Sequence, residues 1–455
     1  MTLAAVLAAC ASNTVGQRGA KPGDRVEVVI MGTTDVHGRL VPWDYYTGQP
    51  EERGLAKVAT LVDSIRAANE RVALIDSGDL LQGNPLDYYF GVVQPAEVHP
   101  VVHAMNYLQY DASTVGNHEF NYGLEALDRA LDDAGFPFVV ANVFVAGTDT
   151  TRWPPYTVIN VGGVLVGVLG FTTPGSTIWD RRHVEGELEF RDIVDSAVRV
   201  WPELEAASDV QIVAIHSGMG PGSSYDAEAT GVPEENAGQR LAETLPGIDA
   251  IVLGHSHVDI PSETVNGVLL TQAAKWGEAL AVATLTLERE EHGWRLVDKV
   301  ATTLSTEGVP SSAGFMAELA PYHEATVAYV ADTIGWTAES WSTARARQID
   351  TPAIDLIQRV QLEATGADLS AASAFTTEAQ IEVGAITVAD AAGLYIYDNT
   401  LKAIEITGAQ LRAYLEYSAR FFHRVDAKGA NVDAEGDFDV FVDSIPGYNY
   451  DMVAG

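Results

Sequence analysis

The stretch VEVVIMGTTDVHGRL, residues Val26–Leu40, decides the fold that we expect for this chain of 455 residues. A β-branched apolar run predicts a buried strand, and Asp35 and His37 follow it next to a glycine. Four later stretches repeat this pattern: VALIDSGD, ASTVGNHE, VQIVAIHSG and IDAIVLGHSH. Because ligands bind at the carboxyl ends of strands in α/β sheets, we expect these five strand ends to meet at one rim.

Side chains at these strand ends are candidate metal ligands. Carboxylate, amide and imidazole donors suit Mn, Zn, Fe, Co or Mg ions, and the pattern does not choose among these metals. Each block alone is most simply a polar strand end that satisfies backbone groups. Their concentration at five strand ends instead favours a site for two divalent metal ions. The candidate ligands are Asp35, His37, Asp79, Asn117, His216, His255 and His257.

The blocks TTDVHGRL, DSGDLLQGN, GNHEFNYG, HSG and GHSH resemble, in this order, the calcineurin-like metallophosphoesterase domain of the 5′-nucleotidase family. The resemblance covers nearly the whole chain after residue 25. Within the family, GNHEFNYG and LYIYDNTL are most similar to the bacterial 2′,3′-cyclic-nucleotide 2′-phosphodiesterase/3′-nucleotidase branch. It implies an α/β fold: a four-layer α/β/β/α sandwich followed by a second α/β domain, the nucleotidase C-terminal domain.

The resemblance also implies roles for single residues. Asp35, His37, Asp79 and His257 would hold one metal ion, and Asp79, Asn117, His216 and His255 the other, with Asp79 bridging the two. His118 would be the catalytic histidine; the alternative is an imidazole packed under the site. The 5′-nucleotidases of the family have an Asp where this chain has Asn121. An amide cannot hold an imidazolium by charge, but it can orient the ring by a hydrogen bond.

Two cations polarise phosphoryl oxygens and activate water, so the expected chemistry is hydrolysis of phosphate esters. The family branch implies that 2′,3′-cyclic nucleotides and 3′-nucleotides are the substrates. Two alternatives stay open: a 5′-nucleotidase or UDP-sugar hydrolase with the same metals, and a surface binder of nucleotides or metals without turnover. The 5′-nucleotidase branch has a substrate-contacting Arg where this chain has Glu378, and a carboxylate cannot replace those donors. This difference favours the 3′ or cyclic branch.

The second domain carries the residues that the resemblance assigns to the nucleobase. Tyr397 would stack on the base and Asn399 would contact it, although a Tyr on a strand more often fills a core. The formal net charge of −36 excludes a broad basic surface for nucleic acid polymers, and the resemblance implies small nucleotides as the partners. The sequence does not predict an oligomeric state.

The stretch LAAC, Leu7–Cys10, resembles a bacterial lipobox and predicts export to the periplasm or cell envelope, with a lipid tether through Cys10. The alternative is that Cys10 is a small buried apolar residue. We expect a signal and tether over 1–25, the catalytic domain over 26–306, a linker and helix over 307–333, and the substrate-binding domain over 334–455. That last domain is expected to be incomplete, because the resemblance would continue beyond Gly455.

Apolar periodicity predicts helices over 53–69, 122–135, 315–332 and 352–366. After His257 the pattern changes to strands alone, which we expect to form a second sheet packed beneath the first. Residues 392–422 are predicted to form a strand, a turn, a second strand and a helix.

Overall fold

The computed structural model describes residues 20–396, 401–419 and 451–454. They divide into two compact units, the first with the described residues up to 44 and residues 49–324, the second with 45–48 and the described residues from 325 onward. Cys10 lies outside the described residues, so the predicted signal and tether stay predictions. Among the described helices, none combines the length and apolar character needed to cross a membrane.

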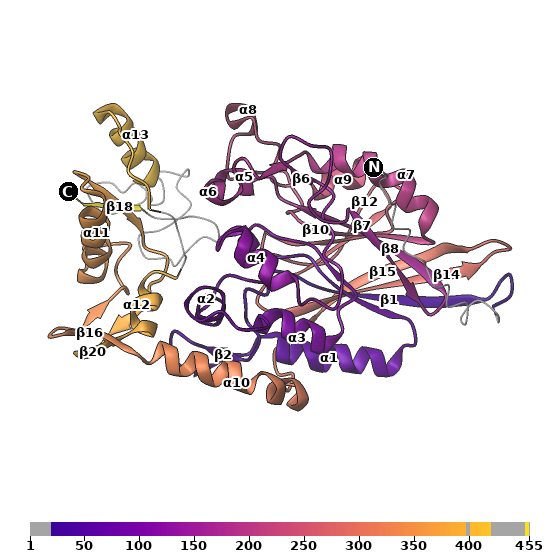
Figure 1. The fold of residues 1–455 in the computed structure, drawn as a ribbon, viewed down its shortest axis with the longest axis horizontal. Coiled ribbons are helices and arrows are strands. Elements are labelled where there is room, and N and C mark those ends of the chain that lie inside the picture. Colours follow the sequence, from indigo (N-terminus) through magenta and orange to yellow (C-terminus); the bar gives the residue numbers. More distant parts are fainter. Residues whose placement is uncertain (1–19, 397–400, 420–450, 455) are drawn as a thin grey trace, which may run out of the picture. The chain divides into compact units, whose positions relative to one another are not determined.

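Two β-sheets form the centre of the first unit (Figure 1). In spatial order, the first sheet consists of β15 (Trp294–Ser305), β14 (Ala279–Arg289), β1 (Arg25–Thr33), β4 (Val72–Asp76) and β5 (Ala112–Ser113). The second consists of β12 (Asp259–Val265), β13 (Val268–Ala273), β11 (Ala250–Leu253), β10 (Val210–His216), β8 (Val164–Thr172) and β7 (Tyr156–Val161). The strands β1, β4 and β5 run parallel, and so do β8, β10, β11 and β13.

The two sheets pack face to face through an apolar core. Ile30 and Ile75 of the first sheet belong to the same buried cluster as Val168, Ile212 and Val252 of the second. A second cluster joins the outer face of the second sheet to α7 (Ile193–Ala207) and α9 (Gly238–Thr244). Strands covered on both faces are apolar throughout, and accordingly every residue of β10 is buried.

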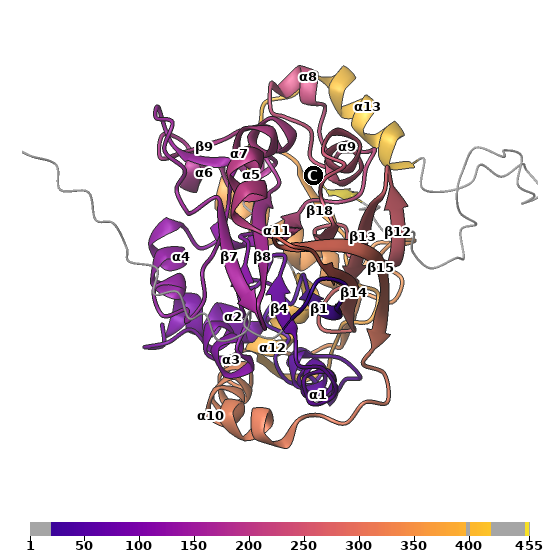
Figure 2. The same ribbon diagram turned by 90° about the vertical axis from the view of Figure 1, so that its right-hand side faces the viewer.

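Helices complete the outer layers of the first unit, as Figure 2 shows from the side. The remaining helical elements are α1 (Leu55–Ala68), α2 (Pro85–Tyr88), the π-helix η1 (Tyr89–Val93), α3 (Pro100–Leu108), the 3-10 helix η2 (His118–Phe120), α4 (Leu124–Leu131), α5 (Ser176–Trp179), α6 (Arg181–Val184) and α8 (Ala227–Thr230). Two short strand pairs, β2 (Trp43–Asp44) with β3 (Gln49–Pro50) and β6 (Val143–Val145) with β9 (Leu188–Phe190), lie outside the main sheets. The predicted four-layer α/β/β/α sandwich is confirmed.

One part of the predicted topology is wrong. The strands after His257 do not form a sheet of their own: β12 and β13 extend the second sheet, whereas β14 and β15 extend the first. The strand β14 pairs antiparallel with β1, so that Met31 lies opposite Val282. Alternation of buried and exposed residues identifies a strand but not the sheet that it joins. The edge of β1 takes the hairpin because its other edge already pairs with β4.

The helix α10 (Ala313–Val330) spans the boundary between the units. In the second unit, α11 (Pro352–Thr365) ends where Gly366 takes a left-handed conformation, as predicted. The other elements there are β16 (Thr333–Thr337), β17 (Trp341–Ser342), β18 (Ser370–Ser373), β19 (Gln380–Ile381), β20 (Gly384–Thr387), α12 (Val388–Leu394), α13 (Gly408–Ala419) and β21 (Asp451–Ala454).

The predicted strands between residues 392 and 407 are wrong where the structure describes them. Leu394 ends the helix α12, and residues 401–407 have no strand. The cause is the Thr387 capping box, in which the Thr387 hydroxyl accepts from the Asp390 amide and the Asp390 carboxylate accepts from the Thr387 amide. This cap starts a helix before the apolar run that we read as a strand. The helix predicted at the end of this segment is present as α13.

We expect Leu285→Ala to lower the free energy of unfolding by about 2–5 kcal/mol, because it empties a fully buried position between the sheets. Val300→Ala is the control: Val300 lies on the neighbouring strand β15 and is 57% exposed, so its loss should cost about 1 kcal/mol or less. Urea denaturation of both variants gives the comparison. Equal losses would show that β14 does not contribute to the inter-sheet core.

Candidate metal centre

The seven candidate ligands meet at the carboxyl ends of five strands. Asp35 and His37 follow β1, Asp79 follows β4, and Asn117 follows β5. His216 is the last residue of β10, and His255 and His257 follow β11. The single rim that the sequence predicts is therefore built from both sheets.

The backbone at this rim is unusual. Nine non-glycine residues in the described part of the chain have positive φ. Five of these nine are candidate ligands: Asp35, His37, Asp79, His255 and His257. Left-handed conformations are unfavourable for side chains other than glycine and persist only where surrounding structure enforces them. Their concentration here indicates that the loops adopt unfavourable backbone conformations because these direct the ligand side chains toward one another.

The ligand atoms form two groups that share Asp79. Asp35, His37, Asp79 and His257 each place a ligand atom within 4.8 Å of the others. In this group His37 Nε2 lies 3.2 Å from His257 Nε2 and 3.8 Å from Asp79 Oδ2. Two imidazole nitrogens and two carboxylate oxygens at these distances form a donor set that suits a divalent cation.

The second group consists of Asp79, His216 and His255, again within 4.8 Å of one another. His216 Nε2 lies 2.9 Å from Asp79 Oδ2 and 3.2 Å from Asn117 Oδ1, so the amide of Asn117 belongs to the same cluster. The structure therefore brings all seven predicted residues together, in the two sets that the resemblance implied. Their function as ligands stays a prediction.

A further layer of contacts fixes which imidazole nitrogen is free. His37 Nδ1 lies 2.6 Å from the Gln82 carbonyl oxygen, and His216 Nδ1 lies 2.8 Å from that of Ser77. Because a carbonyl only accepts, both Nδ1 atoms carry the hydrogen and both Nε2 atoms can bind a cation. In His255, Nε2 lies 2.7 Å from Glu235 Oε1, so Nδ1 is the ring nitrogen that this contact leaves available to a cation.

Two buried carboxylates hold the loops that carry the ligands. Glu119 accepts hydrogen bonds from the backbone N–H groups of Asp79, Leu80, Leu81 and Gly116. A Cβ at Gly116 would lie 2.5 Å from the Asp79 backbone nitrogen, so only glycine permits this approach.

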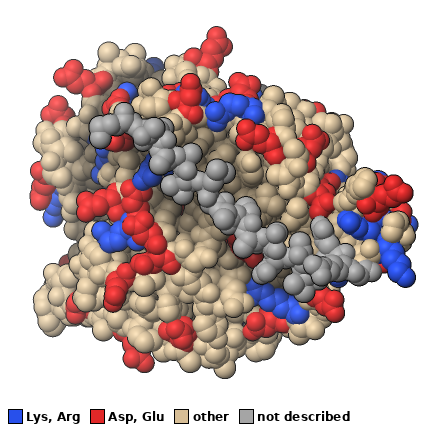
Figure 3. Space-filling view, turned by 45° about the vertical axis from the view of Figure 1, so that its right-hand side comes forward, with Lys and Arg blue, Asp and Glu red and all other residues tan. Residues whose placement is uncertain are grey.

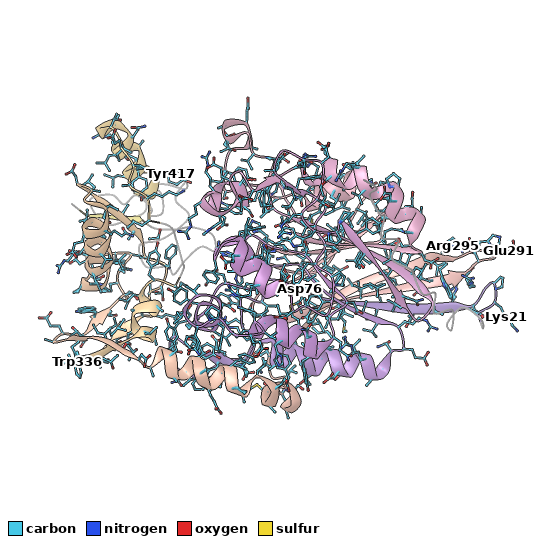
Figure 4. All side chains as sticks on the ribbon, in the orientation of Figure 1. Lys21, Asp76, Glu291, Arg295, Trp336 and Tyr417 are labelled. Carbon is cyan, nitrogen blue, oxygen red and sulfur yellow. The ribbon has the colours of Figure 1, made fainter. Side chains whose placement is uncertain are left out.

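Asp76, at the end of β4, is the second carboxylate and is labelled in Figure 4. It accepts from Thr33 Oγ1 at 2.7 Å, Gly78 N at 2.7 Å and Ser113 Oγ at 3.2 Å. These bonds tie together the ends of β1, β4 and β5. Burial raises the pKa of Asp76 to about 7, against the lowering effect of these donors.

Two buried histidines of the cluster have pKa values that are shifted in opposite directions. Burial lowers the pKa of His37 to about 3, despite the nearby charge of Asp79. At His216 burial also lowers the pKa, but the charge of Asp79 and its hydrogen bond outweigh burial and raise the value to about 10. The charge of Asp79 thus favours a positive charge at His216, so a bound cation would compete with a proton there. Because a metal ligand must be unprotonated, metal uptake here must release a proton.

His118 lies next to this cluster. Its backbone N–H donates to Asp79 Oδ1 at 2.8 Å, and its ring lies 5.1 Å from that of His37. His118 Nδ1 is 2.6 Å from Asn121 Oδ1, the hydrogen bond predicted for this pair. The Asn121 Nδ2 group in turn donates to Asp180 Oδ1 at 2.8 Å. Burial raises the pKa of Asp180, and the hydrogen bond from Asn121 opposes this rise.

Sequence reasoning missed the residues behind the ligands. Glu119 was visible in the GNHE block, but Glu235 and Asp180 lie in loops without any motif that we recognised. Trp179, whose ring stacks on His255 at 5.6 Å between centroids, was also missed. Tyr397 and Asn399, predicted to contact the base, lie outside the described residues.

Comparisons with known proteins identify both parts of the chain. Residues 28–259 match the calcineurin-like phosphoesterase family, and residues 327–449 match the 5′-nucleotidase C-terminal domain. The chain is 32% identical over 483 residues to the trifunctional nucleotide phosphoesterase protein YfkN of Bacillus subtilis, covering 95% of this chain and 32% of that protein. It thus spans about a third of that relative.

The chain is also 30% identical over 484 residues to the 2′,3′-cyclic-nucleotide 2′-phosphodiesterase/3′-nucleotidase of Yersinia enterocolitica, covering 94% of this chain and 72% of that protein. Among solved structures, the calcineurin-like phosphoesterase YfkN from Bacillus subtilis superposes with a TM-score of 0.63 at 33% identity. The superposition covers 67% of this chain and 99% of that one.

We expect the metal-free protein to lose stability as pH rises from about 6.5 to about 10, because the folded-state pKa of His216 is raised above its ordinary value of 6.5. The stabilisation is complete below the lower value, and its loss can reach about 1.4 kcal/mol per pH unit. Urea denaturation in EDTA across this range measures it. Loading with Mn²⁺ should flatten the curve, and so should His216→Gln. A flat curve for the metal-free wild type would contradict the prediction.

Proposed function

Because the chain belongs to the calcineurin-like phosphoesterases that carry a 5′-nucleotidase C-terminal domain, we propose that it hydrolyses 2′,3′-cyclic nucleotides and 3′-nucleotides to nucleoside and phosphate. The observation that supports this most directly is the position of Asp79 in two ligand groups at once, because a shared carboxylate suits a pair of cations. We further propose that two divalent ions bind, one in each group.

When bound, such ions supply polarisation of the phosphoryl oxygens and a water of lowered pKa. The protein's own contribution is positional. The carbonyls of Gln82 and Ser77 leave the Nε2 atoms of His37 and His216 free for the ions. Glu119 fixes the loop that carries Asp79. The burial of Asp35 and Asp79 restricts water in the cluster, which strengthens every charge interaction within it.

His118 is suited to the leaving oxygen. It lies beside the ligand groups, and its Nδ1 is occupied by Asn121. Its Nε2, when the ring is protonated, is then the atom that can stabilise a phosphoryl oxygen or donate a proton to the departing ribose oxygen.

The overall charge opposes an anionic substrate. On the face drawn in Figure 3, acidic side chains are widely spread and basic ones stand singly or in small groups beside them. With 63 acidic and 27 basic residues, the global field repels nucleotides, so attraction must come from the cations themselves. Moderate salt should therefore favour association with substrate.

The rival function is a 5′-nucleotidase. The match to the 5′-nucleotidase C-terminal domain supports it, and so does the 34% identity over 242 residues to the snake venom 5′-nucleotidase of Naja atra. By the resemblance to that branch, two residues argue against it: Asn121 stands where an Asp is expected, and Glu378 stands where a substrate-binding Arg is expected. A non-catalytic binder is the third possibility.

A panel of 2′,3′-cAMP, 3′-AMP, 5′-AMP and UDP-glucose, assayed with Mn²⁺, separates these functions. We expect turnover of the first two to exceed that of the last two at least about ten-fold, since one tenfold step is only about 1.4 kcal/mol of transition-state binding. EDTA should abolish all turnover. Fastest release from 5′-AMP would favour the rival, and no metal-dependent release from any ester would leave a binder.

We expect His118→Ala to lower kcat by about 10²- to 10⁴-fold while KM changes little, because the imidazole acts on charge that develops during the reaction. His292→Ala is a matched control, since His292 is exposed in the turn between β14 and β15. Steady-state kinetics on the best ester of the panel measures both. If kcat of the His118 variant decreases by less than about three-fold, this ring only packs under the site.

A further inference from the structure

We propose that Asp180 is a positioning residue: by accepting from the Asn121 amide nitrogen, it turns the amide oxygen toward His118 and so fixes the imidazole as its Nδ1–H tautomer. This inference rests on the proposed function, because it concerns the histidine that would act in that reaction. No motif pointed to Asp180, which lies 59 residues after Asn121.

The side-chain amide of Asn121 has two different faces, an accepting oxygen and a donating NH₂ group. Asn121 can present either an acceptor or a donor to His118, and the two faces differ only by a 180° turn of its side chain. With the oxygen inward, His118 Nδ1 must carry a hydrogen. With the nitrogen inward, Nδ1 must be the bare acceptor, and the hydrogen moves to Nε2. Asn121 alone therefore does not determine the tautomer, whereas a carboxylate at its position would.

Asp180 removes this ambiguity. A carboxylate only accepts, so the face of Asn121 that meets Asp180 Oδ1 at 2.8 Å must be the NH₂ group. The amide oxygen is then directed at His118 Nδ1, at 2.6 Å. The bare Nε2 atom is left free to take up a proton and, once protonated, to donate it. The charge that other family members place next to the histidine is thus present here, one residue further away.

The surroundings of Asp180 hold it in place for this role. Its side chain is buried, and its backbone connects α5 to α6, with its carbonyl accepting from His183 N at 2.7 Å. Among the described residues, Asn121 is the side chain that donates to its carboxylate, and Oδ2 has no hydrogen-bond partner there. A buried carboxylate with a single side-chain donor contributes little to stability, which suggests a functional reason for its presence.

The test exchanges the two residues. In Asp180→Asn the new amide can donate or accept, so it no longer orients Asn121, and we expect kcat to fall about 10- to 100-fold with KM within two-fold of wild type. The double variant Asn121→Asp/Asp180→Asn again allows only one hydrogen-bond arrangement. The Asp at position 121 accepts from His118, and the amide at position 180 donates to that Asp. Its kcat should return to within about three-fold of wild type, which a purely structural role for Asp180 does not predict.

Two outcomes would overturn the proposal: an unchanged kcat in Asp180→Asn, or a loss that the double variant does not repair although circular dichroism and the melting temperature show it folded. Asp249→Asn is the control. Asp249 is a half-buried carboxylate that accepts from the Gln211 backbone amide, but it lies before β11, at the opposite end of the strand from His255. That variant should keep the wild-type kcat.

A second readout does not depend on turnover. In the Zn²⁺-loaded, ¹⁵N-histidine-labelled protein, the His118 resonances, assigned with His118→Gln, should report hydrogen on Nδ1 in the wild type and in the double variant. Asp180→Asn should shift the population toward hydrogen on Nε2. If no ester of the panel is hydrolysed, the proposed function fails while this measurement still decides the role of Asp180. Hydrogen on Nε2 with none on Nδ1 in the wild type would refute that role.

Discussion

The carboxylate of Asp79 is the point on which the site depends. It faces His37 in one ligand group and His216 in the other, and one of its oxygens also accepts the backbone N–H of His118. Moving it by an ångström would separate both groups and the proposed catalytic histidine at once. The protein therefore surrounds the Asp79 loop with fixed contacts: Glu119 accepts from three successive amides there, and Gly116 packs against its backbone.

The two-sheet architecture explains how seven ligands from distant parts of the chain can be held so closely. Each sheet delivers its parallel strands to the same rim, and the apolar core between the sheets fixes the distance across it. The ligands then reach inward through left-handed turns, whose cost the surrounding hydrogen bonds and packing must offset. The strands thus determine the distances between the ligand-bearing loops, and the left-handed turns determine the direction of the ligand side chains.

Much of this arrangement could be predicted from the sequence, because each ligand carries a local signal. A β-branched run followed by Asp, Asn or His and a glycine identified all five strand ends, and Gly366 identified the end of α11. Long-range choices left no such signal. The pairing of β14 with β1 depends on which sheet edge is open, and Asp180 meets Asn121 only through the folded loops. The failed strand prediction after Thr387 has a local cause, since its capping box competed with the apolar pattern.

The hairpin β14–β15 also constrains how the protein is made. A ribosome releases β1 early, yet Met31 reaches its partner Val282 only after some 250 further residues have been added. At about 5–20 residues per second, β1 waits on the order of ten seconds or more with one edge unpaired. Contacts of such large sequence separation form slowly, and open edges invite wrong pairings meanwhile. The nascent chain should accordingly be most dependent on chaperones before β14 emerges, and the ligand cluster should close only late in synthesis.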